Sequence, residues 1–474
     1  MSAVPPFIPR VTSTAKVLVI GGTGRVGGSV VRALREMVPQ EPPLAGMQPI
    51  IVVGGRDRGA FLQTRERLME QDLAAMMTEG REFSGEGLFG SRGGGDEGGG
   101  GFVEGERVQL GGNRPTLKFF EVDATDPSSV AHAIESTSCD LVVHTAGPFQ
   151  RSTRAAVLEG LLRSGHKCGY VDVCDDYSAA MMAKQMHEEA VSKGVTAILS
   201  GGIWPGVSNL MALEAAELLG GVDKVESTEF SFFTAGSGGA GATLISATFL
   251  ILAEKALAYE KGEAVHYPAG SGIRSVDFGE SIGSRKVYRI NLLETESCHH
   301  VLGVPNTSTY FATAPEFWND LLRLTTLLPS DILGNRELMY SFSDFSMPVI
   351  RAVDAFVGAA NAMRVDARDK NGRHAVCLYG HSDLEVCVGE AVASFAIELL
   401  LQRITGGPPA VPPGVWLPEE TCKNDKALRE RIVRRSARTA YQYDSYVVKE
   451  GERDGEREER NRFESISRGI MAGR

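Results

Sequence analysis

A glycine-rich loop set between a buried strand and a helix is the feature that most constrains the fold of this chain. Residues 17–20 form a short, continuous apolar run, which is typical of a strand buried on both faces of a parallel sheet. Glycines follow at once, and apolar residues then recur at helical spacing, at Val26, Val30, Val31, Leu34 and Val38. This order of strand, loop and helix predicts the first unit of a nucleotide-binding α/β fold.

The spacing of these glycines indicates a phosphate-binding turn. Gly22, Gly24 and Gly27 match G-x-G-x-x-G, and Gly21 with the last two matches the related G-x-x-G-x-x-G. Glycines at such positions permit a tight turn and let the backbone approach a pyrophosphate at the helix N-terminus. A strand-to-helix turn without a ligand is the alternative interpretation. We expect the cofactor to contact Gly21, Gly22, Thr23, Gly24, Arg25, Val26 and Gly27.

The rest of the first half alternates strands with helices. Apolar runs predict strands at 50–53, 117–122, 141–144, 170–173 and 195–199. Amphipathic segments predict helices at 128–136, 154–164 and 179–192. Such regular alternation is typical of a parallel sheet with right-handed crossovers. The predicted fold class is therefore α/β, with a Rossmann-type doubly wound parallel sheet.

A second domain with a different pattern follows. Residues 226–234 and 287–293 have the character of strands, and 244–259 that of a helix. Segments 363–368 and 375–381 are expected to pair as a hairpin, because the Asn-Gly between them favours a tight turn. These features predict an α+β domain with a mainly antiparallel sheet. An apolar helix at 388–402 is expected to return to the first domain.

The expected domain boundaries follow from these patterns. They are 15–209 for the dinucleotide-binding domain, 210–383 for the substrate domain, 384–420 for the returning helix with a Pro-rich segment, and 421–474 for a charged tail. Residues 59–114 interrupt the first domain, since they begin as a helix at 61–77 and then become rich in glycine. Such a segment buries too little apolar surface to fold, so we expect a partly disordered insertion.

The end of the second strand favours NADP over NAD. NAD sites usually place an acidic residue there, on the ribose hydroxyls. This chain has Gly54 and Gly55 instead, followed by Arg56, whose guanidinium can stack on adenine or clamp a 2′-phosphate. Asp57 could still reach a ribose, so NAD remains the alternative.

Further cofactor contacts are expected where the third and fourth strands end, because ligands of such sheets lie outside the carboxyl ends of the strands. Asp123 is predicted to contact the adenine edge or a backbone N–H, with helix capping as an equal alternative. After the fourth strand, the small residues Ala146, Gly147 and Pro148 would let the cofactor pass over the sheet edge.

The loop after the fifth strand carries the candidates for catalysis. Its acidic residues could bind an amino group or shuttle protons, and capping of the following helix is an equal alternative. We predict that Asp175 and Tyr177 orient the substrate or transfer a proton, because both exchange protons and both lie just beyond the strand. The HExxH motif is absent from the sequence, so no metal site is predicted.

Several separated motifs resemble the saccharopine dehydrogenase-like oxidoreductases: the glycine loop at 21–28, Ala146-Gly-Pro-Phe149, Gly169-Tyr-Val-Asp-Val173 and Pro413-Gly-Val-Trp-Leu-Pro-Glu419. The likeness is greatest to the plant and algal branch, through Val52-Val-Gly-Gly-Arg56, Val171-Asp-Val-Cys-Asp-Asp176, Gly201-Gly-Ile-Trp-Pro-Gly-Val-Ser-Asn209 and Thr234-Ala-Gly-Ser-Gly-Gly-Ala-Gly241. The resemblance covers most of residues 16–420 and implies a Rossmann domain, a substrate domain with a mixed sheet, and NAD(P)-linked redox chemistry. The chain departs from the family where Cys174-Asp-Asp176 stands in place of the usual Thr-Gly-Glu.

Composition excludes several other classes of function. The 60 acidic residues outnumber the 49 Lys and Arg, and a net charge of −11 repels phosphate backbones, so no nucleic-acid partner is expected. No apolar stretch reaches the roughly 18 residues that a membrane span needs. The seven cysteines lack any CxxC spacing, which indicates reduced thiols. We expect a cytoplasmic protein, with a plastid as the alternative because the leader before residue 15 carries no acid.

Together these observations predict an NADP-dependent oxidoreductase. We expect hydride transfer to or from a small imine, amino-acid-like or unsaturated substrate, with the cofactor supplying the chemistry. The alternative is a non-catalytic NADP-binding scaffold or interaction protein. Self-association as a homodimer is kept as a further expectation.

Overall fold

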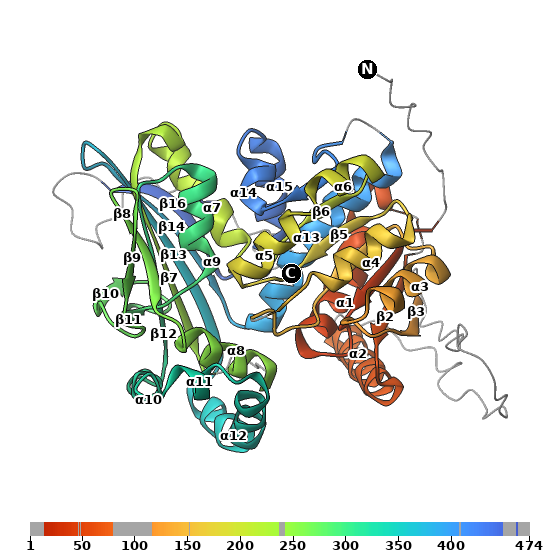
Figure 1. The fold of residues 1–474 in the computed structure, drawn as a ribbon, viewed down its shortest axis with the longest axis horizontal. Coiled ribbons are helices and arrows are strands. Elements are labelled where there is room, and N and C mark those ends of the chain that lie inside the picture. The colour runs from red at the N-terminus through yellow and green to blue at the C-terminus, as the bar shows by residue number, and fades with distance from the viewer. Residues whose placement is uncertain are drawn as a thin grey trace.

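The glycine loop opens an all-parallel sheet, as its sequence predicts. The computed structural model describes residues 14–45, 47, 49–78, 116–150, 152–236, 242–406, 409–448 and 461–462. The sheet has the order β15-β6-β5-β4-β1-β2-β3 (Figure 1). Its strands are β1 (Lys16–Ile20), β2 (Ile50–Gly55), β3 (Thr116–Glu121), β4 (Leu141–His144), β5 (Gly169–Asp172), β6 (Thr196–Ile198) and β15 (Gly414–Trp416).

The predicted doubly wound topology is confirmed. The strand order reverses between β1 and β4, which is where such sheets bind their ligands. Val17 and Val19 face the core shared with α1 (Arg25–Met37) and α13 (Leu384–Thr405). Leu18 faces the opposite core, under α3 (Pro127–Thr137) and α4 (Ala156–Ser164). Because helices cover both faces, β1 is apolar throughout rather than alternating.

Two predicted helices of this domain differ in extent from the sequence pattern. The helix expected at 179–192 is divided into α5 (Tyr177–Lys184) and α6 (His187–Lys193). The division arises because Met186 leaves the helical backbone region and His187 then accepts a hydrogen bond from the Val415 N–H (3.1 Å). The helix expected at 61–77 is α2 (Arg58–Thr78), whereas the Gly-rich remainder of the insertion lies outside the described residues.

The second sheet is mixed and mostly antiparallel, as predicted. Its main path is β10-β11-β12-β7-β13-β14-β16-β17, with β8 pairing to β12 and to β9. Only the pair of β7 and β12 is parallel among the described strands of this sheet. The strands are β7 (Val225–Ala235), β8 (Ala256–Glu260), β9 (Glu263–Tyr267), β10 (Arg274–Asp277), β11 (Ser284–Arg289), β12 (Asn306–Ala314), β13 (Ala360–Asp369), β14 (His374–His381), β16 (Gln442–Val448) and β17 (Asn461–Arg462). The hairpin of β13 and β14 turns at the predicted Asn-Gly.

Helices fill the ends of this second domain. The predicted helix at 244–259 is too long, since α8 (Ala242–Leu252) is followed by β8. An apolar run is compatible with a helix or with a strand. Its last residues form a strand because they pair with β12. The strand expected at 287–293 ends earlier, at Arg289, and Leu293 begins α9 (Leu293–Ser297). Against α8 pack α10 (Phe317–Thr325), α11 (Ser330–Leu333) and α12 (Arg336–Val357), at the lower edge in Figure 1.

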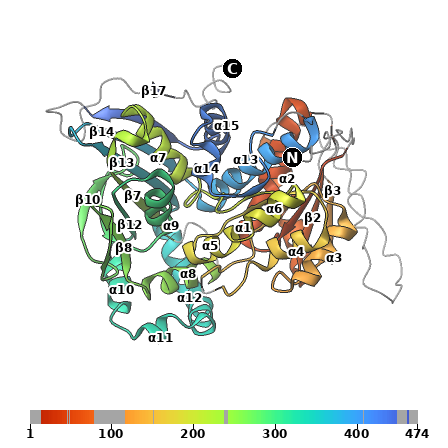
Figure 2. The ribbon, with the colours of Figure 1, turned by 45° about the horizontal axis from the view of Figure 1, so that its top comes forward.

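Residues 421–448 are folded, which corrects the predicted charged tail over this part, whereas residues 449–460 and 463–474 lie outside the described residues. Beyond α14 (Pro418–Cys422), α15 (Lys426–Ser436) buries Leu428, Ile432 and Val433. Strand β16 then pairs with β14, and in Figure 2 α15 lies beside α13 and α14. The prediction of a tail failed over this part because the apolar residues of α15 recur at helical spacing and form a buried face.

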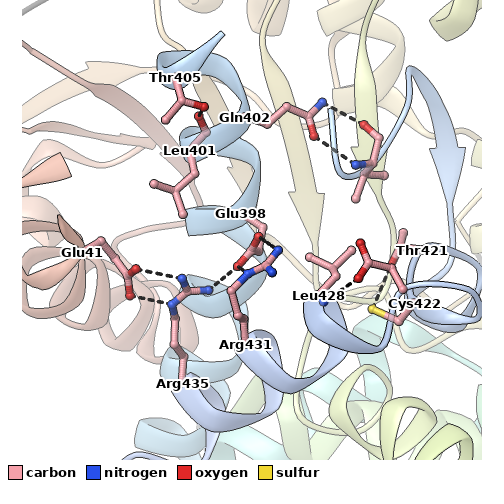
Figure 3. Close-up of polar contacts among 12 residues, drawn as sticks. Glu41, Glu398, Leu401, Gln402, Thr405, Thr421, Cys422, Leu428, Arg431 and Arg435 are labelled. Carbon is pink, nitrogen blue, oxygen red and sulfur yellow. Dashed lines mark hydrogen bonds and ion pairs between the residues drawn. The ribbon is translucent and has the colours of Figure 1, made fainter. Parts of the chain in front are cut away.

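The charges of α15 are paired rather than solvated. Arg435 bridges Glu41 (N–O 2.6 Å) and Glu398 of α13 (2.5 Å), and Arg431 also contacts Glu398 (2.9 Å), as Figure 3 shows. Both guanidinium groups meet carboxylates in a bidentate way at one partner, the geometry that makes Arg–carboxylate bonds strong. Helix α15 is therefore locked to the first domain through α13.

Two expectations about the whole chain can be compared with the fold. All seven cysteines are buried and unpaired, as predicted. In the part of the chain that the structure describes, the helices are either too short or too polar to span a membrane.

Candidate functional site

The glycine loop brings three backbone segments into contact at the start of α1. Gly21 has a φ of +84°, a conformation that side-chain-bearing residues rarely adopt, and its N–H donates to the Gly54 carbonyl (2.9 Å). A Cβ at Gly21 would lie 2.7 Å from the Ala146 nitrogen, and one at Gly27 would lie 2.2 Å from the Gly21 oxygen. Neither position can carry a side chain.

Gly24 differs from its neighbours in being open. It is exposed, and a Cβ there would meet only the Gly21 oxygen, at 3.2 Å. It is also the residue from which α1 begins, so its backbone lies at the positive end of the helix. Each of the three glycines is thus needed for a different reason. Gly21 adopts a positive φ, Gly24 leaves the helix N-terminus open to a ligand, and Gly27 packs closely on the Gly21 carbonyl. This distribution fits the G-x-x-G-x-x-G spacing.

The other loop residues contact neighbouring elements. The Thr23 carbonyl accepts from the Thr64 hydroxyl (3.2 Å), and Val26 is half-buried. Arg25 forms an ion pair with Glu385 in the first turn of α13 (3.3 Å). Burial raises the pKa of Glu385, while the charge of Arg25 opposes that shift. The predicted cofactor residue Arg25 therefore already has an acidic partner on the returning helix.

Two residues after β2, Arg56 and Asp57, bear on the choice between NADP and NAD, and their surroundings differ. Arg56 is exposed. Asp57 accepts from the Gly59 N–H (2.7 Å) and the Ala60 N–H (3.2 Å), so its carboxylate caps the start of α2.

Asp123 does not cap a helix, which removes the alternative raised by the sequence. Asp126 caps α3 by accepting from the Ser128 N–H (2.9 Å). Asp123 instead accepts from the N–H and hydroxyl of Thr125 (2.9 and 2.7 Å). These bonds hold the pKa of Asp123 below its usual value, and the charge of Arg56 adds to the effect. Arg56 and Asp123 thus lie close enough to interact.

The loop after β4 lies against the glycine loop. Thr145 donates both its N–H (2.8 Å) and its hydroxyl (3.0 Å) to the Ile20 carbonyl. This fixes Ala146 beside Gly21, and Gly147 and Pro148 continue along the same edge. The predicted cofactor residues from the first and fourth strands are therefore brought together.

A buried polar chain links the ends of β4 and β5. His144 Nδ1 lies 3.1 Å from the Tyr170 hydroxyl, which donates to Asp172 (3.0 Å). Asp172 also accepts from the N–H groups of Cys174 (3.1 Å) and Ser200 (2.7 Å). Burial lowers the pKa of His144 to about 4 and raises that of Asp172 to about 6. His144 and Asp172 end adjacent strands, β4 and β5, but their link through Tyr170 is not visible in the sequence.

The loop after β5 opens on a cleft shared with the second domain, which we name the acidic cleft. It is a partly open hollow whose empty volume, with open solvent included, is about 290 Å³. Asp175 and Tyr177 both line it, from the side of the first domain. Its lining residues are Gln150, Asp175, Asp176, Tyr177, Ile251, Glu254, Asn291, Leu292, Leu293 and Glu296. The two predicted catalytic residues therefore face the second domain across a cleft.

Burial shifts the titration of the cleft residues towards neutral pH. It raises the pKa of Asp175 to about 6 and that of Glu296 to about 7. The negative charges of Asp176 and Glu254 contribute to the raised pKa of Glu296. Asp176 also caps α5 through the Ala179 N–H (2.7 Å), so the capping alternative holds for this residue. Asp175 is thus poised to exchange a proton near neutral pH.

Tyr177 stands between the acidic cleft and a group of aromatic rings. Its ring stacks on His300 at 6.0 Å, and His300 Nε2 lies 3.0 Å from the Tyr259 hydroxyl. Burial, with the charge of Glu296 as a second cause, raises the pKa of Tyr177 to about 12. The hydroxyl therefore keeps its proton at neutral pH and can donate it in a hydrogen bond.

Sequence reasoning missed half of the acidic cleft. Gln150, Glu254 and Glu296 come from a loop of the first domain and from the ends of α8 and α9, so no local motif links them. Among the described residues, no three His, Cys, Asp or Glu side chains are grouped so that they could hold a metal ion.

Comparison with known proteins shows the fold and little more. Neither a protein-family model nor a curated protein matches the chain. Apo saccharopine dehydrogenase (L-Glu forming) from Saccharomyces cerevisiae is similar in structure, with a TM-score of 0.53 and 12% identity over 92% of this chain and 100% of that one. GenD2 from gentamicin A biosynthesis, in complex with NAD, has a TM-score of 0.36, 11% identity and coverages of 91% and 95%. Levoglucosan dehydrogenase, in complex with NADH, has a TM-score of 0.36, 9% identity and coverages of 91% and 99%. The first likeness supports the fold class, and the other two are too distant to support an argument.

The raised pKa of Asp175 predicts a pH-dependent cost in stability. The folded-state pKa of about 6 lies above the ordinary value of 3.8, so the free energy of unfolding falls as the pH rises through that window. Asp175→Asn should remove this cost and stabilise the protein at pH 8 by about 1–2 kcal/mol, with a smaller gain at pH 5. Urea unfolding at the two pH values measures the difference. Exposed Glu263→Gln is the control and should change neither value, whereas equal gains for Asp175→Asn at both would contradict the assignment.

Proposed function

We propose that the protein is an NADP-dependent oxidoreductase, similar to saccharopine dehydrogenase, that transfers a hydride to or from a small substrate in the acidic cleft. The observation that carries the proposal is the glycine loop, which is closed to side chains at Gly21 and Gly27 and open at Gly24. That arrangement suits a pyrophosphate at the N-terminus of α1. The likeness to the plant and algal branch, which rests on sequence motifs, belongs to the proposal.

The residues that would hold the cofactor surround this loop. The backbone N–H groups of Thr23, Arg25 and Val26, at the start of α1, would meet the pyrophosphate, and Ala146, Gly147 and Pro148 would lie under the nicotinamide half. Asp123 would face the adenine side, beside Arg56. When bound, NADPH supplies the hydride, and the protein supplies position and electrostatics.

The preference for NADP over NAD rests on the end of β2. Asp57 accepts both capping hydrogen bonds of α2 through Oδ1, so only Oδ2 of its carboxylate is left for a ribose. Arg56 is exposed, and its guanidinium can meet a 2′-phosphate in a bidentate way. Both observations support NADP, and NAD stays the alternative.

Asp175 and Tyr177 would handle the proton that accompanies hydride transfer. Tyr177 would orient a polar group of the substrate through its retained hydroxyl proton. Asp175, with a pKa of about 6, would hold or release a proton at the reacting atom. A non-catalytic NADP-binding scaffold is the second candidate, but it would not need buried carboxyls that titrate near neutral pH at a domain boundary. The seven buried, unpaired thiols support a reducing compartment such as the cytoplasm, with a plastid as the alternative.

Self-association is also part of the proposal. Phe317, Leu321 and Leu324 form an exposed stripe along α10, and Leu338, Phe342, Phe345 and Val349 form another along α12. With full side chains of about 150–200 Å² each, the exposed apolar residues of 317–349 present on the order of 1,000 Å². That compares with about 800 Å² per partner in a stable complex.

The cofactor preference gives the first prediction. NADPH should bind more tightly than NADH in calorimetric titration, because Arg56 adds a charge-assisted contact to the 2′-phosphate. Arg56→Ala should remove most of the difference, about 1.5–3 kcal/mol. The neighbouring exposed Arg58→Ala is the matched control and should keep the preference. Equal affinity of the wild type for the two nucleotides would contradict the NADP assignment.

The glycine loop gives the second prediction. Gly24→Val should fold, because its Cβ meets a single atom at 3.2 Å, yet should lose NADPH binding, because its branched side chain fills the approach to the backbone. Gly27→Val should fail to fold, since its Cβ would lie 2.2 Å from the Gly21 oxygen. Circular dichroism reports folding, and fluorescence titration reports binding. A folded Gly24→Val protein that still binds NADPH would exclude the proposed pyrophosphate position.

The apolar stripes give the third prediction. Analytical ultracentrifugation of the full chain should find a dimer, and the double variant Leu324→Asp with Phe345→Asp should be a monomer, because each charge would be buried in the interface. Exposed Ser341→Asp on α12 serves as the control and should remain dimeric. A wild-type monomer at micromolar concentration would remove the dimer from the proposal.

A further inference from the structure

Among the described residues, the acidic cleft is lined by several acidic side chains and by no basic one. Four of its ten lining residues are Asp or Glu, and none is Lys, Arg or His. Within the described ranges, Asp175, Asp176, Glu254 and Glu296 form no ion pair with a basic side chain. Placing like charges together in a partly buried site is unfavourable unless a cation neutralises them.

Further acids lie behind the lining. Glu294 is fully buried and accepts from the Ser208 hydroxyl (2.9 Å), and Glu419 is fully buried and accepts from the Asn209 amide (3.2 Å). The second oxygen of each carboxyl has no hydrogen-bond partner among the described residues. Because burial raises the pKa of both carboxyls to about 7, they add negative charge below the cleft only as the pH rises through neutrality.

Gln150 is an independent sign of a ligand at this cleft. The residue is only 3% exposed, and it lines the cleft. Its amide lies beside Asp175 and lowers the pKa of that carboxyl, as a hydrogen bond from Nε2 would, whereas its Oε1 has no hydrogen-bond partner within the described part of the chain. A buried amide oxygen without a partner is rare in proteins and is satisfied when a ligand supplies a donor. An ammonium N–H would find an acceptor in Gln150 Oε1.

The remaining lining suits a short apolar chain attached to such a cation. Ile251, Leu292 and Leu293 supply an apolar wall, and the Tyr177 ring supplies an aromatic face, which attracts cations. The amide of Asn291 donates to Glu254 (2.8 Å) and so keeps that carboxylate in place. The lining thus combines acceptors for a positive nitrogen with apolar surface for the carbons beside it.

We propose that the acidic cleft binds the positively charged nitrogen of an amine or iminium substrate. Asp175 and Glu296 are its counter-ions, and Gln150 Oε1 accepts from its N–H. A substrate carboxylate is excluded from this position by the same charges, and the described acids offer no metal-binding group. That the bound amine is a substrate rests on the proposed oxidoreductase function. Binding of the cation itself does not need the cofactor.

The proposal predicts that the affinity for the cation depends on pH, and the titratable groups around the cleft set the direction of this dependence. The groups that face the cleft are Asp175, Asp176 and Tyr177 from the loop after β5, Glu254 after α8, and Glu296 of α9, with Glu294 and Glu419 behind them. Burial raises the pKa of Glu294 and of Glu419 to about 7. Because a cation binds the ionised carboxyls, its affinity should rise between pH 5.5 and pH 8, and binding should release protons.

The experiment uses the full chain and isothermal titration calorimetry with 1,4-diaminobutane as the cationic probe. Glutarate, a dicarboxylate of similar length, is the opposite probe. We expect the diamine to bind, with affinity rising about tenfold from pH 5.5 to pH 8, and glutarate not to bind. Glu296→Gln should weaken the diamine by about tenfold or more, because it removes one charge and keeps the shape. Exposed Glu263→Gln should leave the affinity unchanged.

Separate titration with NADPH distinguishes the two proposals. If NADPH binds and the diamine does not, the cation site is wrong and the oxidoreductase assignment stands. If the diamine binds and NADPH does not, the cation site stands and the cofactor assignment fails. Stronger binding of glutarate than of the diamine, or diamine binding that Glu296→Gln leaves unchanged, would also overturn the cation site.

Discussion

The contact of Gly27 with the Gly21 carbonyl is the constraint on which the rest of the structure depends. No side chain separates the loop after β1, the start of α1 and the loop after β4, because a Cβ at either glycine would overlap backbone atoms. This approach fixes α1 over the end of the sheet. Helix α13 then packs on α1 with equal closeness, since a Cβ at Gly389 would lie 2.7 Å from the Ser29 oxygen. The close packing of the first domain therefore determines where the second domain is attached.

Helix α13 connects the two halves of the site physically. It begins three residues after β14 of the second sheet, and its first turn places Glu385 against Arg25 of the glycine loop. Its far end is held by the ion pairs of Glu398 with Arg431 and Arg435 on α15, which itself precedes β16 of the second sheet. The second sheet is thus joined to the first domain at both ends of one helix. This arrangement keeps α9 opposite the loop after β5 and so maintains the acidic cleft.

The features that could be predicted from the sequence are those that depend on the spacing of residues close together in the chain. Alternating strands and helices, the requirements at Gly21, Gly24 and Gly27, and the Asn-Gly hairpin all follow from residues close together in the chain. The boundary between α8 and β8 could not be predicted, because its apolar run suits both states until β12 pairs with it. The fold of α15 was hidden by its charge, since the acids that pair with Arg435 lie far away, at Glu41 and Glu398. The residues that line the cleft from the second domain could not be predicted either, because they too lie far from Asp175 in the sequence.

The unpaired acids of the cleft contrast with two buried carboxyls elsewhere in the described residues. Both of these have basic side chains beside them. Glu398 has two arginines, and hydrogen bonds from His374 and Arg364 hold the pKa of Asp366 below its ordinary value, although burial alone would raise it. At the boundary of the domains, by contrast, burial raises the pKa of Glu296 to about 7 and no described cation opposes it. Since unpaired buried charge lowers stability, its concentration at the cleft is the kind of local cost that binding sites carry and packed cores avoid.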